Sequence, residues 1–195
     1  MNRPELSKLR TNLSSERIDM YQQLSKLGKR YFPNSAHKLF KFMFNLSPMY
    51  RRSTGRVTNV TEGFWKVDIK IPISYKNRNY AGTIFGGSLF SATDPIFMVQ
   101  LVQIIGSAYI VWDKSSVVKF KRPANQDVFA SFAFEEEEVA EIKRQVASKG
   151  EVELVKPVQI TNIEGTVFCQ IDKTIYVADK QFYKNKLRQK RAYIE

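Results

Sequence analysis

The residues best suited to chemistry lie in one stretch, NYAGTIFGGSLFSATD at 79–94. Gly86 and Gly87 stand where a loop is predicted to enter a helix, and the free N–H groups of a helix start stabilise negative charge on a bound carbonyl oxygen. Asp94 follows two helical turns later, on a stripe that is otherwise apolar. A carboxylate there is either a general base or nucleophile, or a structural group that bonds a neighbouring strand or a lysine across a dimer.

Histidine and cysteine are scarce. The chain has one cysteine, Cys169, and one histidine, His37, among 195 residues. These counts exclude an internal disulfide, a thiolate zinc cage and a His-rich metal site, and they argue against Ser-His-Asp and Cys-His catalysis. Acid–base chemistry therefore falls to carboxylates, with no metal and no bound cofactor expected. Cys169 alternates with Val167 and Ile171 in a predicted strand, which indicates a small core residue rather than a nucleophile.

Positive charge is concentrated at the two ends of the chain. The net charge of +12 is made up of +9 over residues 1–56, −2 over 57–179 and +5 over 180–195. Basic ends favour anionic partners, such as phosphates, a lipid headgroup surface, nucleic acid or an acidic protein, and they also increase solubility. No recognisable nucleic-acid-binding module accompanies them, so no specific nucleic-acid binding is expected.

Neither an export signal nor a membrane span is expected. The first twenty residues carry several charges and lack an apolar segment. The longest uncharged run, 95–112, contains Pro95, two glutamines and Gly106, and it passes into a strand-like pattern. A buried helix explains this run better than a transmembrane helix, and the expected location is the cytoplasm.

The spacing of apolar residues predicts three regions. Residues 1–54 form a helical extension, whose apolar and basic helix at 36–46 either packs on the body or acts as a lid or membrane-touching element. Residues 180–195 form a basic tail. Between them, residues 55–179 hold strands at 56–60, 64–71, 109–121, 127–134, 152–162 and 166–178, an apolar helix at 86–106 kinked by Pro95, and a surface helix at 135–148.

This order of elements favours an α+β fold in which one curved antiparallel sheet wraps around a central apolar helix. A single sheet leaves one side of the helix or a sheet edge uncovered. The sequence therefore predicts pairing with a second copy, as a homodimer or a dimer of dimers.

Residues 55–178 resemble the hotdog-fold acyl-CoA thioesterases, specifically the phenylacetyl-CoA thioesterase-like branch, through GGSLFSATD at 86–94 and FKRP at 120–123. That family carries an Asn, a His-Gly-Gly loop and a helical Asp seven residues past the second Gly. Asn79, Gly86, Gly87 and Asp94 occupy the matching positions, whereas the family's His is Phe85 here. The chain is also similar to an uncharacterised hotdog subfamily that shows NYxGTxFGG and a VWDK strand, here at 111–114.

The resemblance implies hydrolysis of a thioester of coenzyme A or of acyl carrier protein. Asp94 would be the general base or the nucleophile, Asn79 would orient the water or the carbonyl, and the Gly87 N–H, with Gly86, would stabilise the oxyanion. The family's site forms between two subunits, so Asp94 of one chain would face Asn79 and the glycine pair of the other.

Four further residues are candidates for substrate binding: Phe85, Phe90, Lys121 and Arg122. The two cations follow a strand end where they would reach coenzyme A phosphates, although we favour solvated charge as their explanation.

Asp113 and Lys114 interrupt an apolar strand and are predicted to pair with each other, as a structural or interfacial salt bridge or as support for the site. Because Phe85 replaces the family's His, the alternative function is acyl-CoA binding without catalysis. A hotdog dehydratase is disfavoured, since it needs a catalytic His and His37 lies far upstream.

Overall fold

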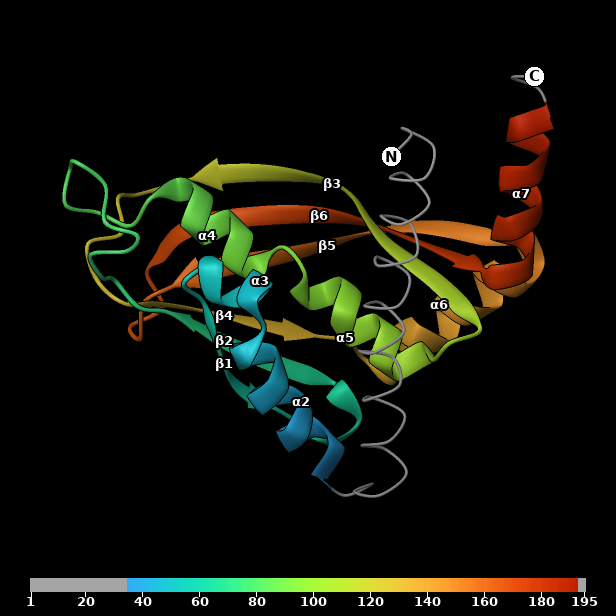
Figure 1. Cartoon of the computed structure of the whole chain (residues 1–195), viewed down its shortest axis with the longest axis horizontal. Helices are drawn as coiled ribbons and strands as arrows, with labels where there is room; N and C mark the ends of the chain where they lie inside the picture. The colour runs from blue at the N-terminus through green and yellow to red at the C-terminus, as the bar shows by residue number, and fades with distance from the viewer. Residues whose placement is uncertain (1–34, 193–195) are drawn as a thin grey trace, which may run out of the picture.

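The computed structural model describes residues 35–192, and its main feature is a six-stranded antiparallel sheet that curves around a central helical segment (Figure 1). Residues 1–34 of the expected helical extension, and residues 193–195, lie outside the described residues. In chain order the elements are α2 (Ala36–Leu46), α3 (Pro48–Arg52), β1 (Arg56–Val60), the short 3-10 helix η2 (Glu62–Phe64), β2 (Lys66–Ile71), α4 (Gly86–Thr93), α5 (Ile96–Ile105), β3 (Tyr109–Phe120), β4 (Val128–Ala133), α6 (Glu136–Lys149), β5 (Glu151–Thr161), β6 (Val167–Asp179) and α7 (Lys180–Ala192).

The strands are ordered β1-β2-β4-β5-β6-β3, so β3 forms one edge of the sheet although it comes from the middle of the sequence. Long ladders join β5 to β6 and β6 to β3. The junction between β4 and β5 is a single paired position, Phe129 with Thr161. This arrangement of one curved sheet around a helix is the hotdog fold, as the resemblance implies.

The inward side chains of the sheet and the buried face of α4 and α5 form the core. On β6 the inward positions alternate, with Ile171, Ile175 and Val177 fully buried. Phe97 of α5 makes an edge-to-face contact with Phe132 of β4, with ring centroids 4.8 Å apart. The central helix therefore packs against β4, and α5 also contacts β3 on the other side of the sheet.

The central helix is interrupted at Asp94-Pro95, where α4 ends and α5 begins. Proline has no N–H to donate and its ring crowds the preceding turn, so the interruption follows from Pro95. The segment Gly86–Ile105 is long and apolar enough to cross a membrane by length and composition alone, but half of it is buried within the protein. Its place as the core helix of the sheet accounts for its composition.

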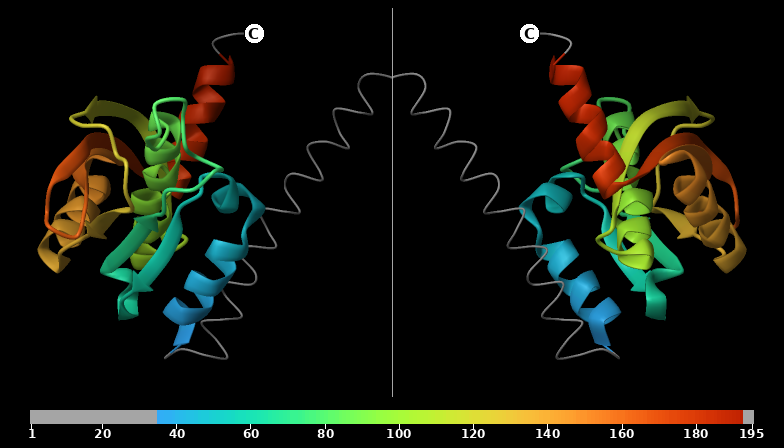
Figure 2. Two further views of the ribbon diagram at one scale, coloured as in Figure 1. Left: turned by 90° about the vertical axis from the view of Figure 1, so that its left-hand side faces the viewer. Right: turned by 90° about the vertical axis from the view of Figure 1, so that its right-hand side faces the viewer.

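The helices α2 and α3 pack on the outside of β1 and of the central helix (Figure 2). Two inward aromatic residues hold α2 in place: Phe40 meets Phe64 with ring centroids 5.1 Å apart, and Phe44 meets Tyr50 at 4.5 Å. Tyr50 is fully buried, its hydroxyl donates to the carbonyl of Ala92 over 3.2 Å, and burial raises its pKa above its usual range.

The elements expected from the sequence are confirmed between residues 35 and 192, and each of the six strands begins and ends within two residues of its predicted limits. The helix at 36–46 and the surface helix are also present, the latter as α6. The basic tail, whose conformation the sequence left open, is helical over Lys180–Ala192 and projects from one end of the molecule (Figure 1).

Candidate functional site

Asp94 is part of a buried ionic cluster with Lys173 and Asp113. The Lys173 ammonium donates to Asp94 Oδ1 over 2.9 Å and to Asp113 Oδ2 over 2.7 Å, and it also makes a short contact with the Asp94 carbonyl oxygen. An ammonium has three hydrogens to donate, so these three acceptors satisfy it. The ring of Phe90 adds a cation–π contact, with its centroid 5.7 Å from the nitrogen.

Three elements position this cluster. Lys173 lies at an inward position of β6, between the apolar inward residues Ile171 and Ile175, and its side chain is fully buried. Asp113 lies inward on β3, next to a bulge that shifts the register between Asp113 and Ser115. The interruption before Pro95 leaves the Asp94 carbonyl without a backbone N–H from any described residue, and Lys173 takes that acceptor instead.

The two carboxylates differ in environment. The Asp94 side chain is 49% exposed, and its Oδ2 accepts no hydrogen bond from a described residue. The Asp113 side chain is 17% exposed, and its Oδ1 is buried without a partner among residues 35–192. Burial raises the pKa of Asp113 and the nearby Asp94 charge adds to this, although Lys173 opposes both. The sequence predicted Asp94 as the buried carboxylate, whereas Asp113 is the more buried of the two.

The start of α4 has free N–H groups, as predicted. The Phe85 N–H donates to the Asn77 carbonyl over 2.7 Å, and the Phe85 carbonyl accepts from Ser88 over 2.9 Å. The N–H groups of Gly86 and Gly87 have no partner among the described residues. This helix start therefore presents two unpaired donors.

Two aromatic rings crowd the glycines. A Cβ on Gly87 would lie 2.2 Å from Phe85 Cε1, and one on Gly86 would lie 2.8 Å from Phe120 Cζ. Both rings are more than half exposed, so they flank the helix start at the surface. Gly86 and Gly87 are the residues that let the rings lie this close to the backbone.

Asn79 is engaged within its own loop. Its Oδ1 accepts from the Ala81 N–H over 2.9 Å and from the Thr83 N–H over 3.1 Å, and its Nδ2 donates to Thr83 Oγ1 over 3.0 Å. Asn77, which sequence reasoning did not select, is the buried asparagine of this loop and bonds Ser74, Thr54 and the Pro72 carbonyl. Within one chain, Asn79 is thus a loop-forming residue.

Lys121 and Arg122 continue from Phe120 at the end of β3, beside the start of α4 (Figure 1). Both side chains are exposed, and their backbone N–H groups donate to the Phe168 carbonyl over 2.8 and 3.2 Å. The Gly86 contact with Phe120 therefore brings the two cations to the same end of the molecule as the glycine pair.

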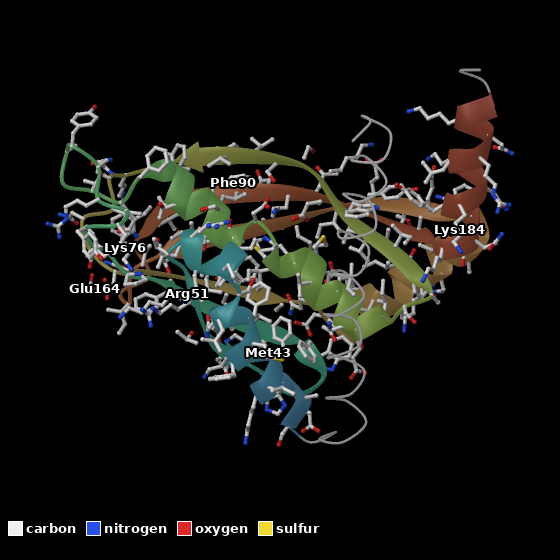
Figure 3. All side chains as sticks on the ribbon, in the orientation of Figure 1. Met43, Arg51, Lys76, Phe90, Glu164 and Lys184 are labelled. Atoms are coloured by element: carbon white, nitrogen blue, oxygen red, sulfur yellow. The ribbon has the colours of Figure 1, made fainter. Side chains whose placement is uncertain are left out.

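The predicted residues fall into two groups on one helix. Phe85, Gly86 and Gly87 lie at the start of α4. Phe90, which is labelled in Figure 3, and Asp94 lie beside Lys173. Asp94 follows Gly87 by seven residues, which amounts to about 10 Å along the helix axis. A thioester and one water molecule would have to span that distance within a single chain.

Lys173 is the main residue that sequence reasoning missed. Its signal was present, because Cys169, Ile171, Ile175 and Val177 alternate as inward residues of β6 and a lysine occupies the position between them. The expected pairing of Asp113 with Lys114 is wrong. Asp113 pairs with Lys173, and Lys114, which follows at the bulge, pairs with Glu153.

Two remaining features lie apart from the cluster. Cys169 is buried and burial raises its pKa to about 11, as expected of a core thiol. A cavity of about 440 Å³ lies near the far end of α5, lined by Ala36, His37, Glu62, Gly63, Phe64, Trp65, Gln103 and Ile104. None of the predicted site residues lines it.

Residues 36–177 match the model of a family described as a domain of unknown function, DUF4442, and the chain belongs to this family. No curated protein matches the sequence.

Solved structures share the fold. A protein from Pseudomonas aeruginosa described as a probable thioesterase is 19% identical, with a TM-score of 0.65 over 73% of this chain and 95% of that one. A protein of unknown function from Chlorobaculum tepidum is 19% identical, with a TM-score of 0.62 over 76% and 97%. A thioesterase from Haemophilus influenzae is 12% identical, with a TM-score of 0.54 over 73% and 90%. At these identities the likeness establishes the hotdog fold.

Proposed function

We propose that this protein is a thioesterase that hydrolyses acyl-CoA. The observation that carries the proposal is the half-exposed Asp94 carboxylate, held by the buried Lys173, on a helix that begins with two N–H groups unpaired within residues 35–192. A base and an oxyanion donor are the two groups that thioester hydrolysis requires. The names of similar structures from Pseudomonas aeruginosa and Haemophilus influenzae support the same class of reaction.

In the proposed reaction, Asp94 removes a proton from water while the water oxygen attacks the thioester carbonyl carbon. The Gly87 N–H, with that of Gly86, stabilises the oxyanion of the tetrahedral intermediate. The carbon–sulfur bond then breaks, the carboxylic acid is released, and the proton returns from Asp94 to the departing thiolate. Lys173 fixes one oxygen of Asp94, which leaves Oδ2 for the water. The alternative, in which Asp94 attacks the carbonyl itself, uses the same groups.

The substrate class we propose is a coenzyme A thioester of the kind that the phenylacetyl-CoA thioesterase-like branch hydrolyses. Phe85 and Phe120 offer aromatic surface beside the helix start, and Phe90 offers it beside Asp94. Lys121 and Arg122 supply positive charge for the coenzyme phosphates, or for the phosphopantetheine of an acyl carrier protein. No cofactor beyond the coenzyme A of the substrate takes part.

We further propose that the complete site needs two chains. Asp94 of one protomer would act with Asn79 and the glycine pair of the other, which removes the need for one substrate to span about 10 Å of α4. The edge strand β3, with Trp112 and Val117 more than half exposed, is the surface we assign to this pairing.

The test is an acyl-CoA panel, from acetyl to palmitoyl and including phenylacetyl, followed with a thiol reagent. We expect turnover that Asp94→Asn lowers by about two to four orders of magnitude without loss of folding, as for the loss of a general base. Asp172→Asn is the matched control, because Asp172 lies on the same strand as Lys173 but pairs with Lys119. An unchanged rate in folded Asp94→Asn would place the chemistry elsewhere.

Acyl-CoA binding without hydrolysis is the second candidate, and specific observations favour it. Phe85 stands where the family has its His, and the side chain of Asn79 is engaged by its own loop. Titration with a non-hydrolysable thioether analogue of acyl-CoA separates the two functions. Binding with no turnover across the panel would establish the second, and neither binding nor turnover would remove both.

A further inference from the structure

The outward surface of α2 and α3 is apolar although the helices are already anchored. Phe40 and Phe44 face the core, as described above. Three other side chains are exposed on the opposite side: Phe42 at 63%, Leu46 at 54% and Met49 at 56%. Phe42 and Leu46 lie one turn apart on α2, and Met49 lies in the first turn of α3, just after Ser47, which joins the two helices. Because the inward residues already fix α2, these three are not needed for packing within residues 35–192.

Positive charge flanks these three side chains at both ends. Lys38 precedes Phe42 by one helical turn, and Arg51, which is labelled in Figure 3, and Arg52 follow Met49 in the chain. None of these three cations forms an ion pair with any residue from 35 to 192. Residues 35–61 contain five Lys or Arg and no Asp or Glu. We call Lys38, Phe42, Leu46, Met49, Arg51 and Arg52 the α2–α3 face.

We propose that the α2–α3 face binds the surface of an anionic lipid bilayer. A helix that lies in a membrane interface places its apolar side chains among the acyl chains and its cations among the phosphates, which is the distribution found here. Charge complementarity argues against a second copy as the occupant, because two copies of this face would bring cations together. Figure 2 shows α2 along an outer margin of the molecule, where it can lie flat on a surface. This binding is separate from the chemistry proposed for Asp94.

The test is flotation of the full chain with vesicles of phosphatidylcholine alone, or with about 30% phosphatidylglycerol. We expect the protein to float with the anionic vesicles at about 50 mM salt, less at about 500 mM, and little with neutral vesicles. Phe42→Ser with Leu46→Ser should weaken binding at least about tenfold, because two apolar anchors are lost. Arg51→Gln with Arg52→Gln should weaken binding to the anionic vesicles and leave the weak binding to neutral vesicles unchanged.

Two double variants serve as controls. Val155→Ser with Ile163→Ser removes two other exposed apolar side chains, at 62% and 87% exposure, and should leave binding unchanged. Lys184→Gln with Arg188→Gln reduces the charge of α7 and should also leave binding unchanged. Circular dichroism checks that each variant is folded.

Three results would overturn the proposal. The first is that the full chain does not float with anionic vesicles, which would leave residues 1–34 or another protein to cover the α2–α3 face. The second is that the serine variant at Phe42 and Leu46 binds vesicles like wild type while the α7 variant does not, which would assign binding to the charge of α7. The third is that light scattering gives a smaller oligomer for the serine variant at Phe42 and Leu46 than for wild type, which would assign the α2–α3 face to contact with a second copy.

Discussion

Lys173 is a cation fully removed from water, so its charge is tolerated only because acceptors surround the ammonium group. Replacing it with Met would leave the buried Asp113 carboxylate without its only positive partner among residues 35–192. We expect Lys173→Met to lower the free energy of unfolding by about 3–5 kcal/mol, the usual cost of removing one member of a buried ion pair. Urea unfolding measures this effect.

Lys119→Met is the control for that prediction. Lys119 pairs with Asp172 at 3.6 Å, and its side chain is 52% exposed, so its loss should cost less than about 1 kcal/mol. Adding Asp113→Asn to Lys173→Met should recover part of the stability, because the unpaired carboxylate is then gone. Equal costs for Lys173→Met and Lys119→Met would show that the buried cluster contributes nothing to stability.

Asp113 predicts a dependence of stability on pH. Burial raises its pKa in the folded protein above the ordinary 3.8, so the folded chain holds this proton more tightly than the unfolded chain. The contribution of Asp113 is therefore most favourable below pH 3.8, where both states are protonated, and it becomes less favourable as the pH rises through the raised pKa. The difference in unfolding free energy, wild type minus Asp113→Asn, should therefore fall as the pH rises from the ordinary carboxyl pKa of 3.8 through the raised pKa of the folded protein. A constant or rising difference would contradict this.

At this scale the sequence predicts residue types better than partners. Asp94 and the glycine pair are recognisable because they depart from the pattern around them. The partner of Asp94 is not, because Lys173 is 79 residues away and only the order of the strands brings it close. The resemblance selects Asn79 by its position seven residues before Gly86, whereas the buried asparagine of this loop is Asn77, which bonds Thr54 from 23 residues earlier in the chain.

Among the elements, α4 offers a direct test of the oxyanion donor. Gly87 is in the first turn of α4, where Pro is tolerated because the N–H has no partner in the helix. The preceding Gly86 has no Cβ to clash with the proline ring. Both Gly87→Ala and Gly87→Pro displace the Phe85 ring. The alanine variant keeps the N–H of residue 87, whereas the proline variant removes that N–H.

We expect Gly87→Pro to turn over acyl-CoA about 10²–10³ times more slowly than Gly87→Ala, the usual effect of losing one oxyanion donor. Thermal unfolding of the two variants should differ little, since the helix loses no hydrogen bond. Equal turnover by the two variants would mean that another group stabilises the oxyanion.

The elements themselves were predictable because each carries a local pattern. Alternating apolar residues mark the strands, and Pro95 marks the interruption of the central helix. The way in which these elements assemble into the sheet was only partly predictable. The bulge at Asp113–Ser115 shifts the register of β3 against β6, so that Asp113 and Lys114 have different partners. This bulge arises from pairing with β6 and could not be predicted from the local sequence.

For the molecule as a whole, the open edge of β3 predicts association. Among the described strands β3 pairs only with β6, and Trp112 and Val117 are exposed on it at 52% and 56%. We expect light scattering at micromolar concentration to give twice the chain mass of 22.6 kDa, or four times for a dimer of dimers. A monomer would contradict both the association and a site shared by two chains.

The order of strands also decides when the parts of the molecule can come together. A chain emerges from the ribosome N-terminal end first, so β1, β2, β4 and the central helix are available long before β6. Asp94 and Asp113 are synthesised 79 and 60 residues ahead of Lys173, and β3 has no described neighbour until β6 arrives. Contacts between residues so distant in sequence form slowly. A chain released before residue 167 would hold both carboxylates but lack their cation, so the candidate site should be among the last parts of the molecule to become native.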